Sequence, residues 1–201
     1  MAKTILCDLG NVIVFVDHKK ITEGLEKFSN KNKDEIHNFF INSRARKKFD
    51  KGRISPKQLF EDFKSNLNLN MNFNQFKRIW RSCFYGLNKD MEKLLYRLKK
   101  NYKLVLLSNT DEMHFNYIKS KYKVLNIFNE FVLSYKVGCA KPNPLIYLEA
   151  LKKCRAFPWD IIYIDDISKF VATAKLFGIK SLQYKNFGKL KQDLKNYKVK
   201  L

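Results

Sequence analysis

The stretch TILCDLGNV, residues 4–12, decides how the rest of the chain is interpreted. Its first four residues are mostly apolar or β-branched, which is typical of a short buried strand. Asp8 follows directly, and Gly10 and Asn11 are residue types that favour turns. If the chain goes on to build a parallel sheet, Asp8 lies in a functional loop, because ligands bind at the carboxyl ends of such strands.

Residues 88–201 carry the repeated pattern of a parallel sheet with crossover helices. Amphipathic segments that predict helices alternate with short apolar runs that predict buried strands. Helices are expected at 91–98, from about 110, at 145–151 and at 170–177, and strands at 104–107, 131–133, 161–164 and 179–182. We therefore predict an α/β fold with a Rossmann-like, doubly wound parallel sheet.

Residues 17–87 show helical periodicity without strand-like runs between the helices. Ser55 and Asn72 each precede a glutamine three residues later, which is the pattern of a capping box at a helix start. This segment interrupts the α/β pattern just after its first strand. We predict an α/β core made of residues 1–16 and 88–201, with an inserted helical cap domain of residues 17–87.

Charge is the most unusual feature of the composition. The chain has 201 residues, 45% of them hydrophobic, and a formal net charge of +21 at pH 7. Binding to nucleic acid or to an anionic membrane would need clustered cations. The basic residues are instead spread along the chain, with the densest stretches at 44–48 and 185–200. We expect a solvated basic surface and no specific nucleic-acid partner.

The distribution of apolar residues and cysteines gives an expectation for the compartment. No apolar run reaches the ~20 residues of a membrane span, and Asp8 interrupts the short apolar run near the N-terminus. The four cysteines are widely spaced without a Cys-x-x-Cys pair, which indicates neither a zinc site nor a disulfide framework. We expect a cytoplasmic protein without a membrane partner.

Four loops at the predicted strand ends gather the unusual polar residues of the core. They are residues 8–11, 108–110, 141–142 and 165–166. Together they hold three carboxylates, a hydroxyl-bearing serine and a lysine ammonium. Carboxylate oxygens suit a divalent cation such as Mg²⁺, and positive charge with N–H groups suits phosphate oxygens. The sequence therefore predicts a site for a phosphate and magnesium.

At this point the chain resembles a known family. Asp-Leu-Gly-Asn-Val at 8–12 resembles the first motif of the haloacid dehalogenase-like hydrolases, in the branch that includes sugar-phosphate phosphatases. The segments 106–110, 138–142 and 164–166 resemble the second, third and fourth motifs, and 49–55 resembles the usual link before a cap helix. The match runs over essentially the whole chain, and four motifs in the family order are a specific signal.

The resemblance implies a nucleophile and a metal site. Asp8 would attack phosphorus and form an aspartyl-phosphate that water later hydrolyses, a role that carboxylates are known to play. Magnesium would be held by a second oxygen of Asp8, the backbone carbonyl of Gly10 and the carboxylate of Asp166. Asp165 would lie close by, either behind the metal ligands without binding the metal itself or as an alternative ligand.

The resemblance also implies a phosphate-binding site. Ser108 and the backbone N–H of Asn109 would hold phosphate oxygens, together with the loop that contains Gly10 and Asn11. Lys141 would neutralise the charge of the phosphate and of the nucleophile, which makes it part of the catalytic group. Among so many lysines, this assignment rests on the Gly-x-x-Lys-Pro context.

One position departs from the pattern that many family members share. Those members carry a second Asp two residues after the nucleophile, which acts as general acid and base, and here that position is Gly10. The sugar-phosphatase-like branch shares this glycine, so the resemblance still implies an active enzyme. It leaves open which group protonates the departing oxygen.

Two classes of function stay open from the sequence. The first is a magnesium-dependent phosphatase of small phosphate monoesters, with sugar phosphates among the candidates. The alternative is a catalytically weak binding or regulatory protein on the same fold that uses its basic surface. The sequence identifies neither the substrate nor the oligomeric state, and Arg44, Arg46 and Arg53 of the cap are as compatible with solvent as with a ligand.

Overall fold

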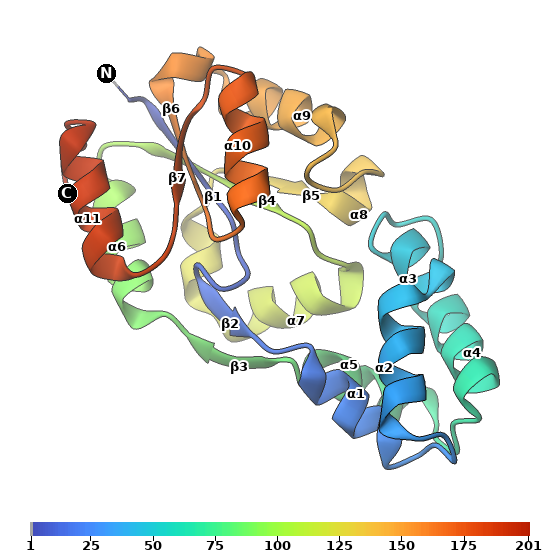
Figure 1. Cartoon of the computed structure of the whole chain (residues 1–201). Helices are drawn as coiled ribbons and strands as arrows, with labels where there is room; N and C mark the ends of the chain where they lie inside the picture. The colour runs from blue at the N-terminus through green and yellow to red at the C-terminus, as the bar shows by residue number, and fades with distance from the viewer. Residues whose placement is uncertain (1) are drawn as a thin grey trace.

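Five parallel strands form the central sheet (Figure 1), in the order β5-β4-β1-β6-β7. The computed structural model describes residues 2–201. The predicted α/β fold with a doubly wound parallel sheet is confirmed, and each expected strand overlaps a strand of the sheet. The strands are β1 (Thr4–Cys7), β4 (Lys103–Ser108), β5 (Glu130–Leu133), β6 (Ile161–Asp165) and β7 (Lys180–Gln183).

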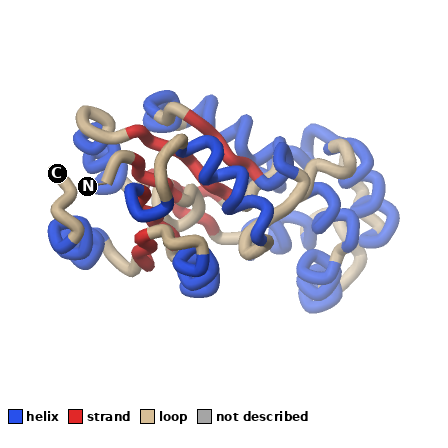
Figure 2. The backbone as a smooth tube through the Cα atoms, turned by 90° about the horizontal axis from the view of Figure 1, so that it is seen from above, coloured by secondary structure: helices blue, strands red, loops and turns tan. Residues whose placement is uncertain are grey.

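Helices cover both faces of this sheet, as Figure 2 shows from above. In β1, Ile5 and Cys7 pack into one cluster of buried residues and Leu6 packs into the other. This alternation follows from the two-residue period of a strand, and apolar residues on both faces are what a doubly covered sheet requires. The two layers of helices therefore hold the strand ends in a fixed arrangement.

The core helices are placed by their apolar stripes. Those of α6 (Lys89–Leu98), α7 (Glu112–Lys121) and α11 (Phe187–Asn196) belong to the cluster that contains Ile5. Those of α9 (Pro144–Cys154) and α10 (Ser168–Leu176) belong to the cluster that contains Leu6. Short helical turns complete the core: α8 (Ser134–Val137) and 3₁₀ turns at Lys123–Ile127 and Pro158–Asp160.

Five further helices fill the segment between β1 and β4 and gather at one side of the sheet (Figure 1). Both predicted capping boxes are confirmed, at Ser55 before α4 and Asn72 before α5. Trp80 of α5 is buried among aromatic rings, among them Phe63 and Phe76. The helices are α1 (Lys19–Glu26), α2 (Lys33–Asn42), α3 (Arg44–Phe49), α4 (Pro56–Leu67) and α5 (Phe73–Arg81).

A two-stranded antiparallel sheet, which was not predicted from the sequence, joins the ends of the helical segment. It pairs β2 (Val14–Val16) with β3 (Phe84–Leu87). Each strand is short, so neither shows a clear two-residue period. The division into a core of residues 1–16 and 88–201 and a cap of residues 17–87 stays a prediction, with this small sheet lying at its boundaries.

The second feature missed from the sequence is α11, which runs through the Lys-rich stretch 185–200. Only Leu190 and Leu194 of this helix are buried. Two apolar residues among many lysines do not make a helical period that can be recognised in the sequence. Among residues 2–201, no helix is both long and apolar enough to cross a membrane.

The register of β1 sets the position of the candidate nucleophile. Cys7 lies level with Leu106 of β4 on one side and with Ile164 of β6 on the other. Asp8 therefore leaves the sheet beside Asp165, at the central strand. From β1 the chain builds β4 and β5 on one side of the sheet and then crosses over to build β6 and β7 on the other side. The strand order therefore reverses beside β1, and ligands bind in the crevice at the carboxyl ends of the strands at such a point.

Candidate active site

A cavity of about 390 Å³ lies at the carboxyl ends of the central strands. Its walls come from the loops after β1, β4 and β6, from the Lys141 loop, and from the helical segment. Of the site residues expected from the sequence, all line this cavity except Asp165, which is fully buried beside it. The lining residues from that set are Asp8, Gly10, Asn11, Ser108, Asn109, Lys141 and Asp166.

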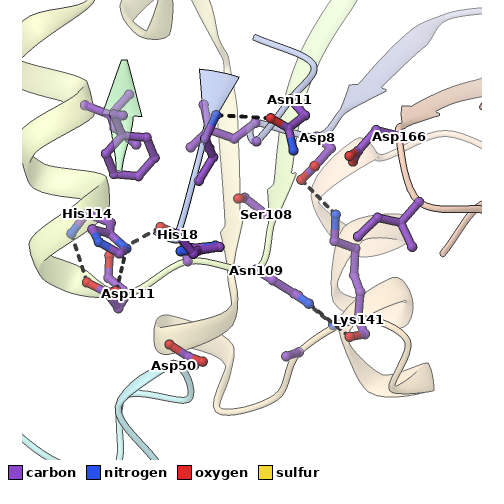
Figure 3. Close-up of a pocket in the computed structure, with 18 of the residues that line it drawn as sticks. Asp8, Asn11, His18, Asp50, Ser108, Asn109, Asp111, His114, Lys141 and Asp166 are labelled. Carbon is purple, nitrogen blue, oxygen red and sulfur yellow. Dashed lines mark hydrogen bonds and ion pairs between the residues drawn. The ribbon is translucent and has the colours of Figure 1, made fainter. Parts of the chain in front are cut away.

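Lys141 is the centre of a buried charge network (Figure 3). Its ammonium donates to Asp8 Oδ1 at 2.8 Å, to Asp165 Oδ2 at 2.6 Å and to the carbonyl of Leu107 at 3.2 Å. Three acceptors use all three N–H groups of an ammonium. Burial alone would lower the pKa of Lys141, but Asp8 and Asp165 outweigh it and raise the pKa. Lys141 is therefore charged and held against the Asp8 carboxylate.

Asp165 is occupied by donors from the protein itself. Its Oδ2 accepts from Lys141 and from the hydroxyl of Tyr163, and its Oδ1 accepts from the backbone N–H of Ile167 at 2.8 Å. A carboxylate engaged on both oxygens has little capacity left for a further ligand. Asp165 therefore lies behind the cavity wall, where it holds the ammonium of Lys141.

Asp8 and Asp166 face the cavity with Asp165 close behind. Carboxylate oxygens of the three residues lie within 4.8 Å of one another, and with Lys141 they form what we call the strand-end cluster. Burial raises the pKa of Asp8, an effect that Lys141 opposes. Burial and then Asp165 raise the pKa of Asp166. Three carboxylates against one ammonium leave an excess of negative charge that suits a divalent cation.

Ser108 and Asn109 have different roles in the structure. The Ser108 side chain is buried at the end of β4, and its hydroxyl makes no hydrogen bond with any of residues 2–201, so it is free to bind a group in the cavity. The Asn109 side chain instead holds the Lys141 loop: its amide donates to the carbonyl of Lys141 at 2.9 Å and accepts from the Lys141 N–H at 2.7 Å. This contact orients the lysine.

A second charged cluster lies where the helical segment meets the core, and no sequence motif predicted it. Asp111 Oδ1 accepts the His114 backbone N–H at 2.9 Å, and Asp111 Oδ2 accepts the indole N–H of Trp80 at 3.0 Å and lies 2.7 Å from His114 Nδ1. His114 Nε2 lies 2.7 Å from the carbonyl of Trp80. We call Trp80, Asp111 and His114 the cap latch.

The charge of the cap latch follows from its geometry. Both ring nitrogens of His114 face oxygen acceptors, so both carry protons and the ring is an imidazolium. Although burial by itself would lower it, contact with Asp111 raises the pKa of His114 well above its ordinary value. Burial likewise would raise the pKa of Asp111, but His114 holds it below its ordinary value. The pair is ionised and internally balanced.

Three polar residues of the helical segment complete the cavity wall: His18, Arg46 and Asp50. From the sequence, Arg46 was one of three arginines that were as compatible with solvent as with a ligand, and neither His18 nor Asp50 was predicted to be a site residue. Arg44 and Arg53 are exposed and do not line the cavity. The resemblance of residues 49–55 to a cap link was the one sequence signal near Asp50.

Sequence comparisons place the chain among known proteins. A family model described as haloacid dehalogenase-like hydrolase matches residues 19–184. The chain is also 26% identical over 202 residues to a D-ribitol-5-phosphate phosphatase of Bacteroides thetaiotaomicron, in an alignment that covers 96% of this chain and 97% of the relative.

Solved structures share the fold at lower identity. A haloacid dehalogenase (HAD) family enzyme of Bacteroides thetaiotaomicron, in complex with magnesium and inorganic phosphate, matches with a TM-score of 0.84 and 24% identity over 94% of this chain and 99% of that one. A HAD-like family hydrolase of Porphyromonas gingivalis matches with a TM-score of 0.85 and 19% identity over 100% of both chains. At these identities the likeness shows the fold alone.

Proposed function

The chain belongs to the haloacid dehalogenase-like hydrolase family, and on that premise we propose that it is a magnesium-dependent phosphatase of small phosphate monoesters. The observation that carries the proposal is the strand-end cluster, in which Lys141 bridges Asp8 and Asp165 beside Asp166. The phosphatase named among the relatives and the magnesium and phosphate of the similar structure support the same reaction class.

The donor set of the strand-end cluster fits magnesium. Mg²⁺ prefers oxygen ligands and is usually bound by one or two carboxylates together with substrate phosphate and water. Asp8 and Asp166 would hold it together with the carbonyl of Gly10, and Asp165 would hold Lys141 in place. When bound, the metal supplies positive charge beside the phosphate oxygens.

Each side chain of the site has its own role in the proposed reaction. An oxygen of Asp8 bonds to phosphorus as the bond to the ester oxygen breaks, which gives an aspartyl-phosphate and a departing oxygen that takes up a proton. Water then attacks phosphorus, the acyl phosphate bond breaks, and phosphate leaves with Asp8 restored as a carboxylate. Lys141 orients Asp8 and opposes the rise in its pKa that burial causes. The Ser108 hydroxyl and the N–H of Asn109 bind phosphate oxygens.

A screen of phosphate monoesters with the purified protein tests this proposal. Release of inorganic phosphate should require magnesium and should stop when a chelator is added. Sugar phosphates, polyol phosphates and an aryl phosphate cover the main leaving-group classes. If none of these esters is hydrolysed with magnesium present, the proposal is wrong and the alternative of a binding or regulatory protein takes its place.

A further inference from the structure

His18, Arg46 and Asp50 converge on the cavity from the helical segment. Figure 3 shows His18 and Asp50 across the cavity from Asp8 and Asp166. The strand-end cluster lies at the phosphate end of the proposed site. The opposite wall therefore faces the part of a phosphate ester that leaves, and its side chains contact whatever that leaving group carries.

Two of these side chains have unused hydrogen-bonding capacity. The nearest partner of the Asp50 carboxylate is Arg46 Nε, at 4.0 Å, and neither Asp50 nor the His18 ring makes a side-chain hydrogen bond with the described residues. Burial raises the pKa of Asp50 to about 6. Burial also lowers the pKa of His18 to about 4, and the nearby charge of Arg46 adds a smaller effect in the same direction. Near neutral pH, Asp50 is an acceptor, and His18 is an uncharged donor and acceptor.

The positions of Asp50 and Arg46 are fixed by the fold. The carbonyl of Asp50 accepts the buried hydroxyl of Ser134 at 2.7 Å. Two residues later, Gly52 has φ of +64°, and a Cβ there would lie 2.0 Å from the carbonyl oxygen of Tyr135. The Arg46 guanidinium lies 4.1 Å from the centre of the Phe40 ring and donates to the Phe40 carbonyl at 3.3 Å. Side chains held in this way bind without a large ordering cost.

The charges at this end of the cavity balance. Arg46 offsets Asp50, and His114 offsets Asp111 within the cap latch. The remaining wall is largely apolar and includes Phe40, Trp80 and Phe84. A second anionic group or an ammonium would disturb this balance, whereas a neutral group with hydroxyls on a carbon chain satisfies both the polar and the apolar parts of the wall.

We propose that His18, Asp50 and Arg46 form a hydroxyl-recognition site, which selects phosphate monoesters whose leaving group is a polyol or a sugar. The assignment rests on the proposed phosphatase function, because it concerns the substrate of the same cavity. Hydroxyls of the leaving group donate to Asp50, exchange hydrogen bonds with His18 and accept from Arg46. The chain thereby discriminates against esters that lack hydroxyls, since these would leave buried polar groups unpaired.

A matched pair of esters tests this site. Ribitol phosphate and n-pentyl phosphate have the same primary alkyl ester and the same number of carbons, and only the first carries hydroxyls. The native protein should have a higher kcat/KM for ribitol phosphate than for pentyl phosphate. The ratio of the two values should fall on the order of 10- to 100-fold in Asp50→Ala and, separately, in His18→Ala, because each loses hydrogen bonds to the leaving group.

Glu61→Ala is the matched control, since Glu61 is an exposed carboxylate of the same helical segment outside the cavity wall. Its ratio should equal that of the native protein. A ratio near one in the native protein, or an equal loss for both esters in both variants, would overturn the site while leaving the phosphatase proposal intact. No magnesium-dependent hydrolysis of either ester or of phenyl phosphate by the native protein would instead refute the proposed function itself.

Discussion

Two clusters of buried charge adjoin the same cavity and differ in how their charges are compensated. In the strand-end cluster, three carboxylates share one ammonium, and Asp8 and Asp166 face open space. In the cap latch, one carboxylate meets one imidazolium, and the indole and carbonyl of Trp80 complete their hydrogen bonds. The first cluster lies in the loops of the sheet, and the second joins α5 to α7.

This difference indicates that the strand-end cluster binds a ligand and that the cap latch stabilises the fold. Buried charge is costly unless it is paired and hydrogen-bonded, so an unbalanced cluster is maintained for what it binds. A balanced cluster has no such need, and breaking it leaves an uncompensated charge inside the protein. The strand-end cluster should therefore govern activity, and the cap latch should govern stability.

The largest effect is expected for Asp8→Asn. An amide is a poor nucleophile, so turnover of any phosphate ester should fall by several orders of magnitude. The variant should remain folded, because removal of one negative charge relieves the excess in the cluster. Steady-state kinetics with saturating magnesium and circular dichroism measure the two properties. Near-normal turnover in the folded variant would exclude Asp8 as the nucleophile.

Asp111→Asn should show the opposite pattern, with a large loss of stability. The variant leaves the His114 imidazolium buried without its counter-charge, and breaking a buried pair in this way costs about 3–5 kcal/mol. Urea unfolding at neutral pH measures the change in the free energy of unfolding. Glu149→Gln, which removes the partly exposed carboxylate of the surface Lys152–Glu149 pair, is the control and should cost less than about 1 kcal/mol. Equal costs for the two variants would contradict the distinction.

Gly10 lies where many family members carry the Asp that acts as general acid and base, so Gly10→Asp tests what the missing acid costs the strand-end cluster. A Cβ at Gly10 would lie 3.5 Å from the side chain of Val16, an ordinary contact distance, so Gly10→Asp should fold. Native turnover should fall as the leaving-group pKa rises, since Gly10 cannot donate a proton. The variant should flatten this dependence and raise turnover of alkyl phosphates by up to ~100-fold, the low end of general acid contributions.

The dependence of native turnover on the leaving-group pKa tests the prediction for Gly10. A series of aryl and alkyl phosphates, graded by the pKa of the leaving alcohol, gives the slope for native protein and for Gly10→Asp. A flat series for the native protein would show that another group in the cavity already acts as the acid.

The smallest expected effect is the pH dependence of the cap latch. The folded pKa of His114 is raised, so its contribution is complete below the ordinary pKa of ~6.5 and is lost as the pH rises through the folded value. The folded pKa of Asp111 is lowered, so its contribution is complete above ~3.9 and is lost as the pH falls through the folded value. The stability difference between native protein and Asp111→Asn should therefore be largest between these limits and should shrink in alkali.

The sheet and the four loops were predictable from the sequence because polar residues directly after apolar runs are a local signal. Asp8, Ser108 and Asp165 could be placed at one edge of the sheet without knowing any contact. The order of parallel strands then brings these loops together. Their presence in one cavity with Lys141 is what the structure adds.

The cap latch and the hydroxyl-recognition site were not predictable in the same way. Trp80 and Asp111 are 31 residues apart, and nothing in the local pattern of either residue indicates their contact. Asp111 followed by His114 matches an ordinary helix start, so the spacing carries no sign of an ion pair. Asp50 and His18 lie in a segment whose packing on the core depends on long-range contacts, such as that of Ser134 with Asp50.

Chemical trapping of the aspartyl-phosphate tests most directly whether Asp8 is the attacking carboxylate. Borohydride reduces an acyl phosphate to an alcohol, so Asp8 would become homoserine when the protein is quenched during turnover and then reduced. Peptide mass spectrometry should find homoserine at position 8 only in samples that received both substrate and magnesium. Turnover without any such conversion, or conversion at Asp165 or Asp166 instead, would contradict the assignment of Asp8.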